Sequence, residues 1–109
     1  MANIKKIEAH EAHGILEANP HTLLVCAYED EDMFLQNHLE GAISLQDFML
    51  RMHSFAKDKP IIFYCADEGE KTSTAQAVNF MIEGFTNVSV LEGGVNAWKE
   101  AGWHVLAAT

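Results

Sequence analysis

The sequence predicts a three-layer α/β fold, in which a central, mostly parallel sheet of about five strands carries helices on both faces. Several short apolar runs lack polar alternation, which is typical of strands covered on both faces. Segments with helical spacing separate these runs, and strands that alternate with helices usually form a parallel sheet. The chain has 109 residues, 49% of them hydrophobic, and we expect one domain over residues 1–109.

The first half of the chain contains both kinds of segment. In order, we expect a helix over residues 7–18, a strand over 23–27, a helical turn at 33–35, a strand over 41–45 and a helix through Phe48, Met49 and Met52. Pro20 ends the first helix, because proline cannot continue it. The two strands are short apolar runs, and Gly41 opens the second of them.

The second half repeats the alternation. In order, we expect a strand over residues 61–65, a helix from Ser73 to Gly84, a last strand over 88–91 and a helix that ends at Gly102. The strand over residues 61–65 has β-branched and aromatic side chains and should lie centrally. Ser73 and Gln76 have the spacing of a capping box. Gly93 and Gly94 predict a tight turn that needs positive φ or close backbone approach.

Composition restricts the partners of the protein. Seven Lys and Arg against sixteen Asp and Glu give a formal net charge of -9, which should repel nucleic acid and anionic membrane surfaces. No apolar run reaches the roughly 20 residues that a membrane-spanning helix needs. Two distant cysteines form neither a disulfide framework nor a metal site, so we expect free thiols in a cytoplasmic protein.

Cys65 is the candidate nucleophile. It ends the most apolar strand, and a short loop then leads into a hydroxyl-rich helix start. This order directs the positive end of a helix dipole at the sulfur and favours the reactive thiolate. Backbone amides of the loop should surround the sulfur as well, and they belong to Ala66, Asp67, Glu68, Gly69, Glu70 and Lys71.

Three stretches of the chain together resemble the rhodanese family of sulfurtransferases. They are Val90-Leu91-Glu92-Gly93-Gly94 followed by Trp98 and Ala101-Gly102, then Phe34 with His38-Leu39-Glu40-Gly41-Ala42-Ile43, and Tyr64-Cys65 with the loop and helix behind it. The resemblance covers residues 4–105 and implies the rhodanese-like fold. It also implies that Cys65 takes sulfane sulfur from thiosulfate or a protein persulfide and passes it to a thiol acceptor. No metal or cofactor is implied.

Two departures from the family pattern concern activity. Many members carry Asp-x-Arg after the early strand, and residues 26–29 supply neither side chain. The usual basic residue five positions after the cysteine is replaced by Glu70, and Lys71 follows at position six. That longer loop resembles dual-specificity phosphatases and arsenate reductases of the same fold, which use arginine there. The alternatives to a sulfurtransferase are therefore such a cysteine-dependent enzyme with a seven-residue loop, or a weak or inactive binding or redox-sensing module.

Several side chains near Cys65 have two interpretations. Asp67, Glu68 and Glu70 oppose a thiolate if they face it, and either point to solvent or select cationic and protein partners. Lys71 is a surface charge or the cation that steadies a persulfide.

The hydroxyls near Cys65 and the second cysteine also have alternative roles. Thr72 and Ser73 are helix caps or contact the sulfur. Cys26 lies within an apolar run and is predicted to be a core residue, with a resolving thiol as the alternative. His10 and His13 share a helix face without a further ligand, so we expect no metal site.

Overall fold

A four-stranded parallel sheet forms the centre of the molecule. The computed structural model describes residues 4–28, 38–39, 41–65, 71–103 and 105–106. Within them the strand order is β1 (Lys5–Ile7), β5 (Val88–Leu91), β4 (Ile61–Tyr64) and β2 (Leu23–Cys26). All three strand pairs are parallel, and a single parallel bridge joins Ile43 to Val25 of β2. The predicted fold class and the central place of β4 are confirmed.

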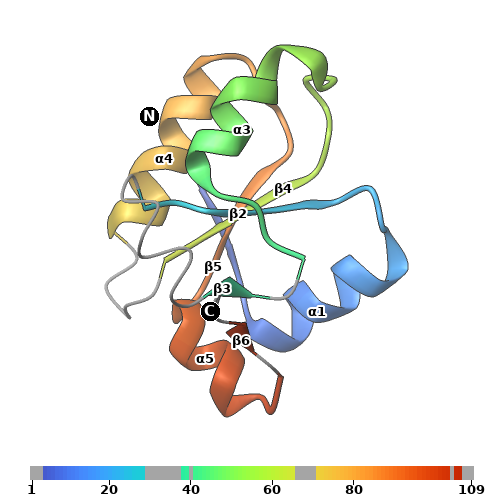
Figure 1. Ribbon diagram of the computed structural model, residues 1–109, viewed down its shortest axis with the longest axis vertical. Helices are drawn as coiled ribbons and strands as arrows, with labels where there is room; N and C mark the ends of the chain where they lie inside the picture. The colour runs from blue at the N-terminus through green and yellow to red at the C-terminus, as the bar shows by residue number, and fades with distance from the viewer. Residues whose placement is uncertain (1–3, 29–37, 40, 66–70, 104, 107–109) are drawn as a thin grey trace.

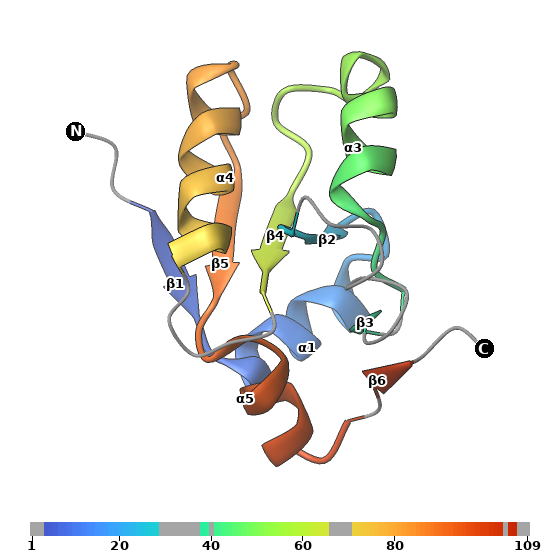
Figure 2. The same cartoon turned by 60° about the vertical axis from the view of Figure 1, so that its left-hand side comes forward.

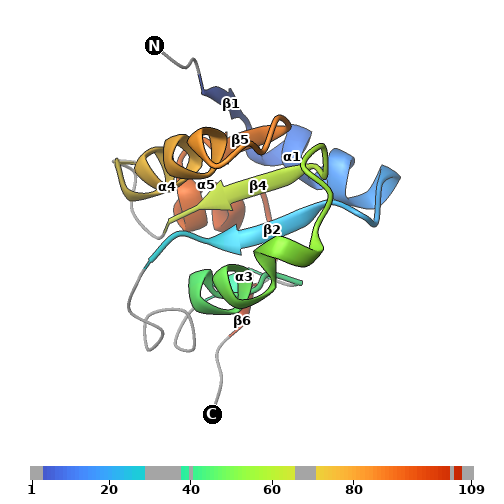
Figure 3. The same ribbon diagram turned by 90° about the horizontal axis from the view of Figure 1, so that it is seen from above.

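Helices cover both faces of this sheet. On one face lie α3 (Leu45–Arg51), the 3-10 turn η1 (Met52–Ser54) and α4 (Lys71–Ile82). On the other lie α1 (Ala9–Ala18) and α5 (Gly94–Glu100). Figure 1 shows α3 and α4 above the strands and α1 and α5 beside and below them. Figure 3 shows the four strands between these two helical layers. Connections of this kind place the carboxyl ends of the strands at one edge, where ligands usually bind in such sheets.

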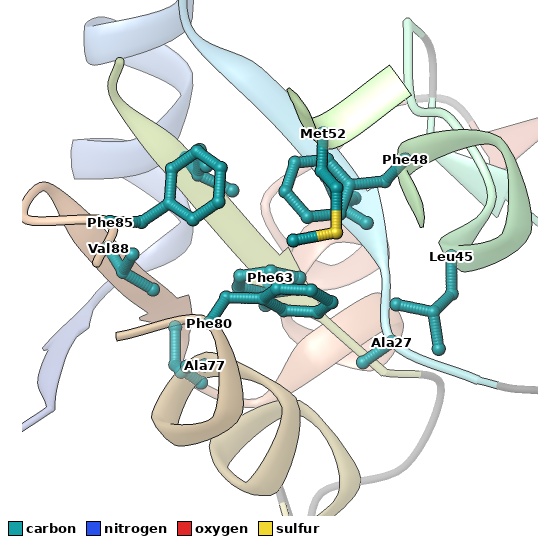
Figure 4. Packing of buried hydrophobic residues seen from close by; sticks show 12 residues of the cluster. Ala27, Leu45, Phe48, Met52, Phe63, Ala77, Phe80, Phe85 and Val88 are labelled. Atoms are coloured by element: carbon teal, nitrogen blue, oxygen red, sulfur yellow. The ribbon is translucent and has the colours of Figure 1, made fainter. Parts of the chain in front are cut away.

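A cluster of aromatic rings fills the space under α3 and α4. Phe80 of α4 lies edge-on to Phe48 of α3 with ring centroids 4.8 Å apart, and stacks on Phe63 of β4 at 5.6 Å. Figure 4 shows these rings together with Met52 and Phe85 between the sheet and the helices. Such pairs add about 0.5–1.5 kcal/mol each beyond the area they bury, so this cluster fixes α3 and α4 on the sheet.

Alternate residues of the same strands form a second core on the opposite face. Ile62 and Tyr64 of β4 and Leu24 and Cys26 of β2 pack there against α1 and α5. Trp98 of α5 is the largest side chain of this layer. Successive residues of a strand point to opposite faces, and here both faces are buried. This explains why the strands are continuous apolar runs in the sequence.

The N-terminal boundaries differ from the prediction. Helix α1 begins at Ala9, because residues 5–7 form the edge strand β1 beside β5. Residues 41–45 form only the one bridge at Ile43, since the Ser44 hydroxyl accepts the Asp47 N–H at 3.1 Å and caps α3. The helical turn predicted at residues 33–35 lies outside the described residues.

A small second sheet was not predicted from the sequence. It pairs β3 (His38–Leu39) with β6 (Val105–Leu106) in antiparallel orientation. The strand over residues 88–91 is therefore not the last one, and this expectation was wrong. Both strands have two residues, which is too short for a periodic signal.

In the described part of the chain, no helix combines the length and apolar character required to cross a membrane.

Candidate active site

Cys65 lies directly after β4, at the carboxyl edge of the sheet. Its carbonyl oxygen accepts the backbone N–H of Val95 in the first turn of α5 at 3.0 Å, which fixes the main chain at this point. Its thiol continues the alternation of Ile61 and Phe63 and points to the face covered by α4. The residue is fully buried. Strand, helix and hydrogen bond together hold the sulfur in one position.

The Ser73 hydroxyl lies beside the sulfur, with Ser73 Oγ 3.5 Å from Cys65 Sγ. Both residues are fully buried. Thr72 and Ser73 lie inside α4, which already includes Lys71, so they do not cap it and the predicted capping box with Gln76 is wrong. The hydroxyl of Ser73 instead faces the sheet, where it can donate to the sulfur.

Two effects act on the charge of the Cys65 thiolate in opposite directions. Complete burial disfavours any charged form, because it removes water from the sulfur. The first turn of α4 and the Ser73 hydroxyl favour the anion, since they bring the positive end of a helix dipole and a hydrogen-bond donor to it. Within the described residues, removal of the Ser73 hydroxyl should therefore have a measurable effect on the Cys65 thiolate.

The loop predicted to surround the sulfur lies outside the described residues. Its members are Ala66, Asp67, Glu68, Gly69 and Glu70. The backbone of Lys71 opens α4. The proposed amide cradle and the direction of the three carboxylates therefore stay predictions.

Cys26 lies on the other face of the sheet. It pairs with Tyr64 across β2 and β4 and packs in the core layer under α1 and α5. Burial raises the pKa of the Cys26 thiol, although the backbone N–H of Tyr28 and the Tyr64 hydroxyl act in the opposite direction. The prediction that Cys26 is a core residue is confirmed.

The Tyr64 hydroxyl joins three segments near the site, and sequence reasoning missed it. It accepts the backbone N–H of Leu39 in β3 at 3.2 Å and donates to the sulfur of Cys26. Burial is the main cause that raises the pKa of Tyr64. A tyrosine inside an apolar strand was the available signal, because a buried hydroxyl needs a partner. The residue beside Cys65 thus ties β4 to β2 and β3.

A turn at two glycines places the first residues of α5 beside Cys65. Gly93 has φ 79° and Gly94 has φ 57°, which confirms the predicted need for positive φ. A Cβ on Gly93 would lie 2.6 Å from the Cβ of Ala97 in α5. The turn lets the first residues of α5 reach Cys65, where Val95 makes its hydrogen bond.

The two histidines of α1 pack against a tryptophan. The ring of His13 stacks on Trp103 at 4.0 Å and the ring of His10 meets its edge at 5.0 Å. His13 also contacts Glu17 at 3.0 Å between Nδ1 and Oε1. These contacts join α1 to the segment that leads to β6.

Comparisons with known proteins agree with this geometry. A family model described as the rhodanese-like domain matches residues 8–101. Thiosulfate sulfurtransferase GlpE of Coxiella burnetii is 29% identical over 79 residues, which cover 71% of this chain and 72% of that protein.

Solved structures give the same result. The rhodanese-like domain of the Alr3790 protein from Anabaena sp. has a TM-score of 0.75 and 27% identity, over 96% of this chain and 80% of that one. A thiosulfate sulfurtransferase from Pseudomonas aeruginosa has a TM-score of 0.81 and 26% identity, over 97% of this chain and 20% of that one. The arrangement around Cys65 is therefore set in a fold that known sulfurtransferases share.

Proposed function

Because the chain belongs to the rhodanese-like domain family, we propose that it is a sulfurtransferase in which Cys65 carries sulfane sulfur as a persulfide. The observation that supports this most directly is the contact between Cys65 Sγ and Ser73 Oγ at the junction of β4 and α4. Cys26, the other cysteine of the sequence, ends β2 and lies in the opposite core layer.

The reaction follows from the chemistry of a thiolate and a donor such as thiosulfate. In the first half-reaction the Cys65 thiolate attacks the outer sulfur of the donor and a new S–S bond forms. The S–S bond of thiosulfate breaks, and sulfite leaves with the bonding electrons. In the second half-reaction an acceptor thiolate attacks the outer sulfur of the persulfide, and Cys65 leaves as a thiolate. Atoms and electrons balance without a further oxidant or reductant.

The residues around Cys65 have distinct roles in this proposal. Ser73 donates a hydrogen bond to the thiolate and to the inner sulfur of the persulfide. The N-terminal turn of α4 stabilises the negative charge on the sulfur, and the amides of residues 66–71 surround the outer sulfur. The hydrogen bond from Val95 keeps the Cys65 backbone in place as charge moves. No metal or organic cofactor takes part.

One observation favours a second candidate, a catalytically silent or redox-sensing module. Cys65 has no exposed surface in this structure, and complete burial is also typical of a cysteine with a purely structural role. A phosphatase or arsenate reductase is supported only by the length of the segment from Cys65 to Lys71. Lysine is a point charge and lacks the two-pronged geometry with which arginine holds a tetrahedral oxyanion.

Mass spectrometry after incubation with thiosulfate separates these functions. The sulfurtransferase gains one sulfur atom on Cys65 and loses it again on addition of a thiol or cyanide. Cys65→Ser should abolish this gain, whereas the matched variant Cys26→Ser should retain most of it. No added sulfur on either cysteine would favour the silent module, and turnover of an aryl phosphate or arsenate would favour the phosphatase and reductase class.

A further inference from the structure

A groove with apolar and polar side chains runs along the outside of the α3–α4 layer, and α4, whose Ser73 contacts Cys65, forms one of its walls. It has a volume of about 730 Å³ and lies between α3 with η1 and α4. Leu45, Met49, Met52, Phe80 and Ile82 contribute apolar side chains to it. Met49 is 52% exposed and Ile82 is 76% exposed. Exposed apolar side chains beside a groove are one feature of surfaces that bind partners.

The groove begins next to the proposed nucleophile. Gln76, which lines it, is one helical turn beyond Ser73 on α4, and Ser73 contacts Cys65. Ile82 lines the other end, nine positions after Ser73, which corresponds to roughly 13 Å along a helix. Figure 2 shows α3 and α4 running side by side away from the carboxyl edge of the sheet. A partner in the groove would therefore end about one helical turn from Ser73, the residue that contacts the buried sulfur of Cys65.

The form of the groove suits an amphipathic helix. Two helices border it, so it offers a channel in which two or three turns of a third helix can place residues spaced i, i+3, i+4 and i+7. Met49 and Met52 line it with flexible side chains that adapt to different apolar residues.

Charge selects the chemistry of the partner. The formal net charge of -9 attracts a cationic protein and opposes both small anions and a second copy of the same chain. In the sequence, three acidic residues, Asp67, Glu68 and Glu70, lie between Cys65 and Lys71, the first residue of α4. Among the described residues, Glu83 lines the groove and the Lys57 ammonium donates to the Glu83 carbonyl oxygen at 3.2 Å, while Asp47 and Arg51 pair with each other at 3.9 Å.

We propose that this groove binds a cationic amphipathic helix of a protein that accepts sulfur from Cys65. The inference rests on the proposed function and gives it an acceptor class. The helix has an apolar stripe in the groove, basic residues on its flanks and a cysteine at the end that lies beside Cys65. That cysteine attacks the outer sulfur of the persulfide as a thiolate, and the Cys65 thiolate leaves.

The test uses a synthetic peptide of about four turns, with leucines at i, i+3, i+4 and i+7, lysines elsewhere and one terminal cysteine. A matched peptide has glutamate in place of lysine. Binding to the isotope-labelled full chain is followed by NMR. The lysine peptide should shift the amides of residues 45–53 and 76–83, and at low salt it should bind at least about tenfold more tightly than the glutamate peptide.

Variants of the protein test the groove itself. Met49→Gln and Ile82→Gln should each reduce the affinity for the lysine peptide about tenfold, because each removes a large apolar contact. Leu50→Gln is the matched control: Leu50 is 85% exposed and apolar but does not line the groove, and affinity should stay within about twofold. Equal weakening by all three variants, equal binding of both peptides, or no shift along α3 and α4 overturns the proposal.

Two further readouts separate the docking site from the proposed function. If the lysine peptide occupies the groove but thiosulfate leaves no persulfide on Cys65, the proposed function is wrong and the docking site is supported alone. If the persulfide forms and the peptide does not occupy the groove, the docking site is wrong and the function is supported. A dimer in sedimentation that Ile82→Gln dissociates would assign the groove to a second copy and overturn the cationic partner.

Discussion

Removal of one hydroxyl should change the acidity of Cys65. Ser73 Oγ lies 3.5 Å from Cys65 Sγ, and both groups are buried, so water cannot replace the hydroxyl in Ser73→Ala. A hydrogen bond to a charged group contributes about 1.5–3 kcal/mol. One pKa unit corresponds to about 1.4 kcal/mol, so the pKa of Cys65 should rise by about 1 to 2 units in Ser73→Ala.

The consequence for sulfur transfer can be worked out from the same shift. If the thiol of the parent protein titrates above neutral pH, the thiolate fraction falls by about ten- to hundredfold, and the remaining thiolate becomes about three- to tenfold more nucleophilic. The first half-reaction with thiosulfate at neutral pH should therefore slow by about three- to fifteenfold. At high pH, where the thiolate forms in both proteins, Ser73→Ala should no longer be slower and should exceed its parent by up to about three- to tenfold, because its thiolate is the stronger nucleophile.

The assay follows the ultraviolet absorbance of the thiolate during a pH titration. A Cys26→Ser background leaves Cys65 as the one thiol in the chain. Thr72→Ala is the matched control, because it removes the neighbouring α4 hydroxyl and leaves the contact between Ser73 Oγ and Cys65 Sγ in place. Identical titration curves for Ser73→Ala and its parent, with equal thermal midpoints, would refute the reasoning and leave Ser73 a packing residue.

Three further predictions concern stability, and thermal or denaturant unfolding measures each of them. Tyr64→Phe leaves the Leu39 N–H buried without its acceptor and should cost about 1–3 kcal/mol; a change under about 0.5 kcal/mol would show that another group replaces the hydroxyl. Burial raises the pKa of Cys26, so the protonated thiol contributes to the free energy of unfolding. This contribution is complete below the unfolded thiol pKa of about 8.5 and is lost as pH rises toward the folded value. The free energy of unfolding should fall by at most about 1.4 kcal/mol per pH unit in this range, and Cys26→Ser should remove this pH dependence. Gly93→Ala should destabilise by about 2–4 kcal/mol through positive φ and a Cβ clash, whereas Gly14→Ala in open helix surface should stabilise slightly, and equal midpoints for these two variants would contradict the turn argument.

Strands that are buried on both faces were predictable from the sequence. The runs at residues 23–27, 61–65 and 88–91 correspond to β2, β4 and β5 within one residue at each end. Their apolar content follows directly from the helices above and below them. The edge strand β1 has no such run, because two of its three residues are exposed and only Ile7 is buried. Its strand form depends on pairing with β5, which local sequence does not encode.

The site was predictable in part for the same reason. A strand that ends in a cysteine before a helix places Cys65 at the carboxyl edge whatever the details of the loop. The role of Ser73 depended on where α4 begins: a helix that starts at Ser73 would use the hydroxyl as a cap, and one that already includes Lys71 turns it toward the sheet. The Tyr64 contacts to β3 and β2 join positions far apart in the sequence, so only the tertiary structure reveals them.

The two cysteines determine how a persulfide on Cys65 can be discharged. Cys26 pairs with Tyr64 across the sheet and packs under α1 and α5, while the Cys65 thiol points to α4. Side chains that point to opposite faces cannot form a disulfide without movement of the backbone. Attack by Cys26 on the outer sulfur is blocked by the sheet for the same reason. In the proposed reaction, sulfur on Cys65 therefore leaves to an acceptor from another molecule, and the groove between α3 and α4 is the place proposed for a protein acceptor to bind.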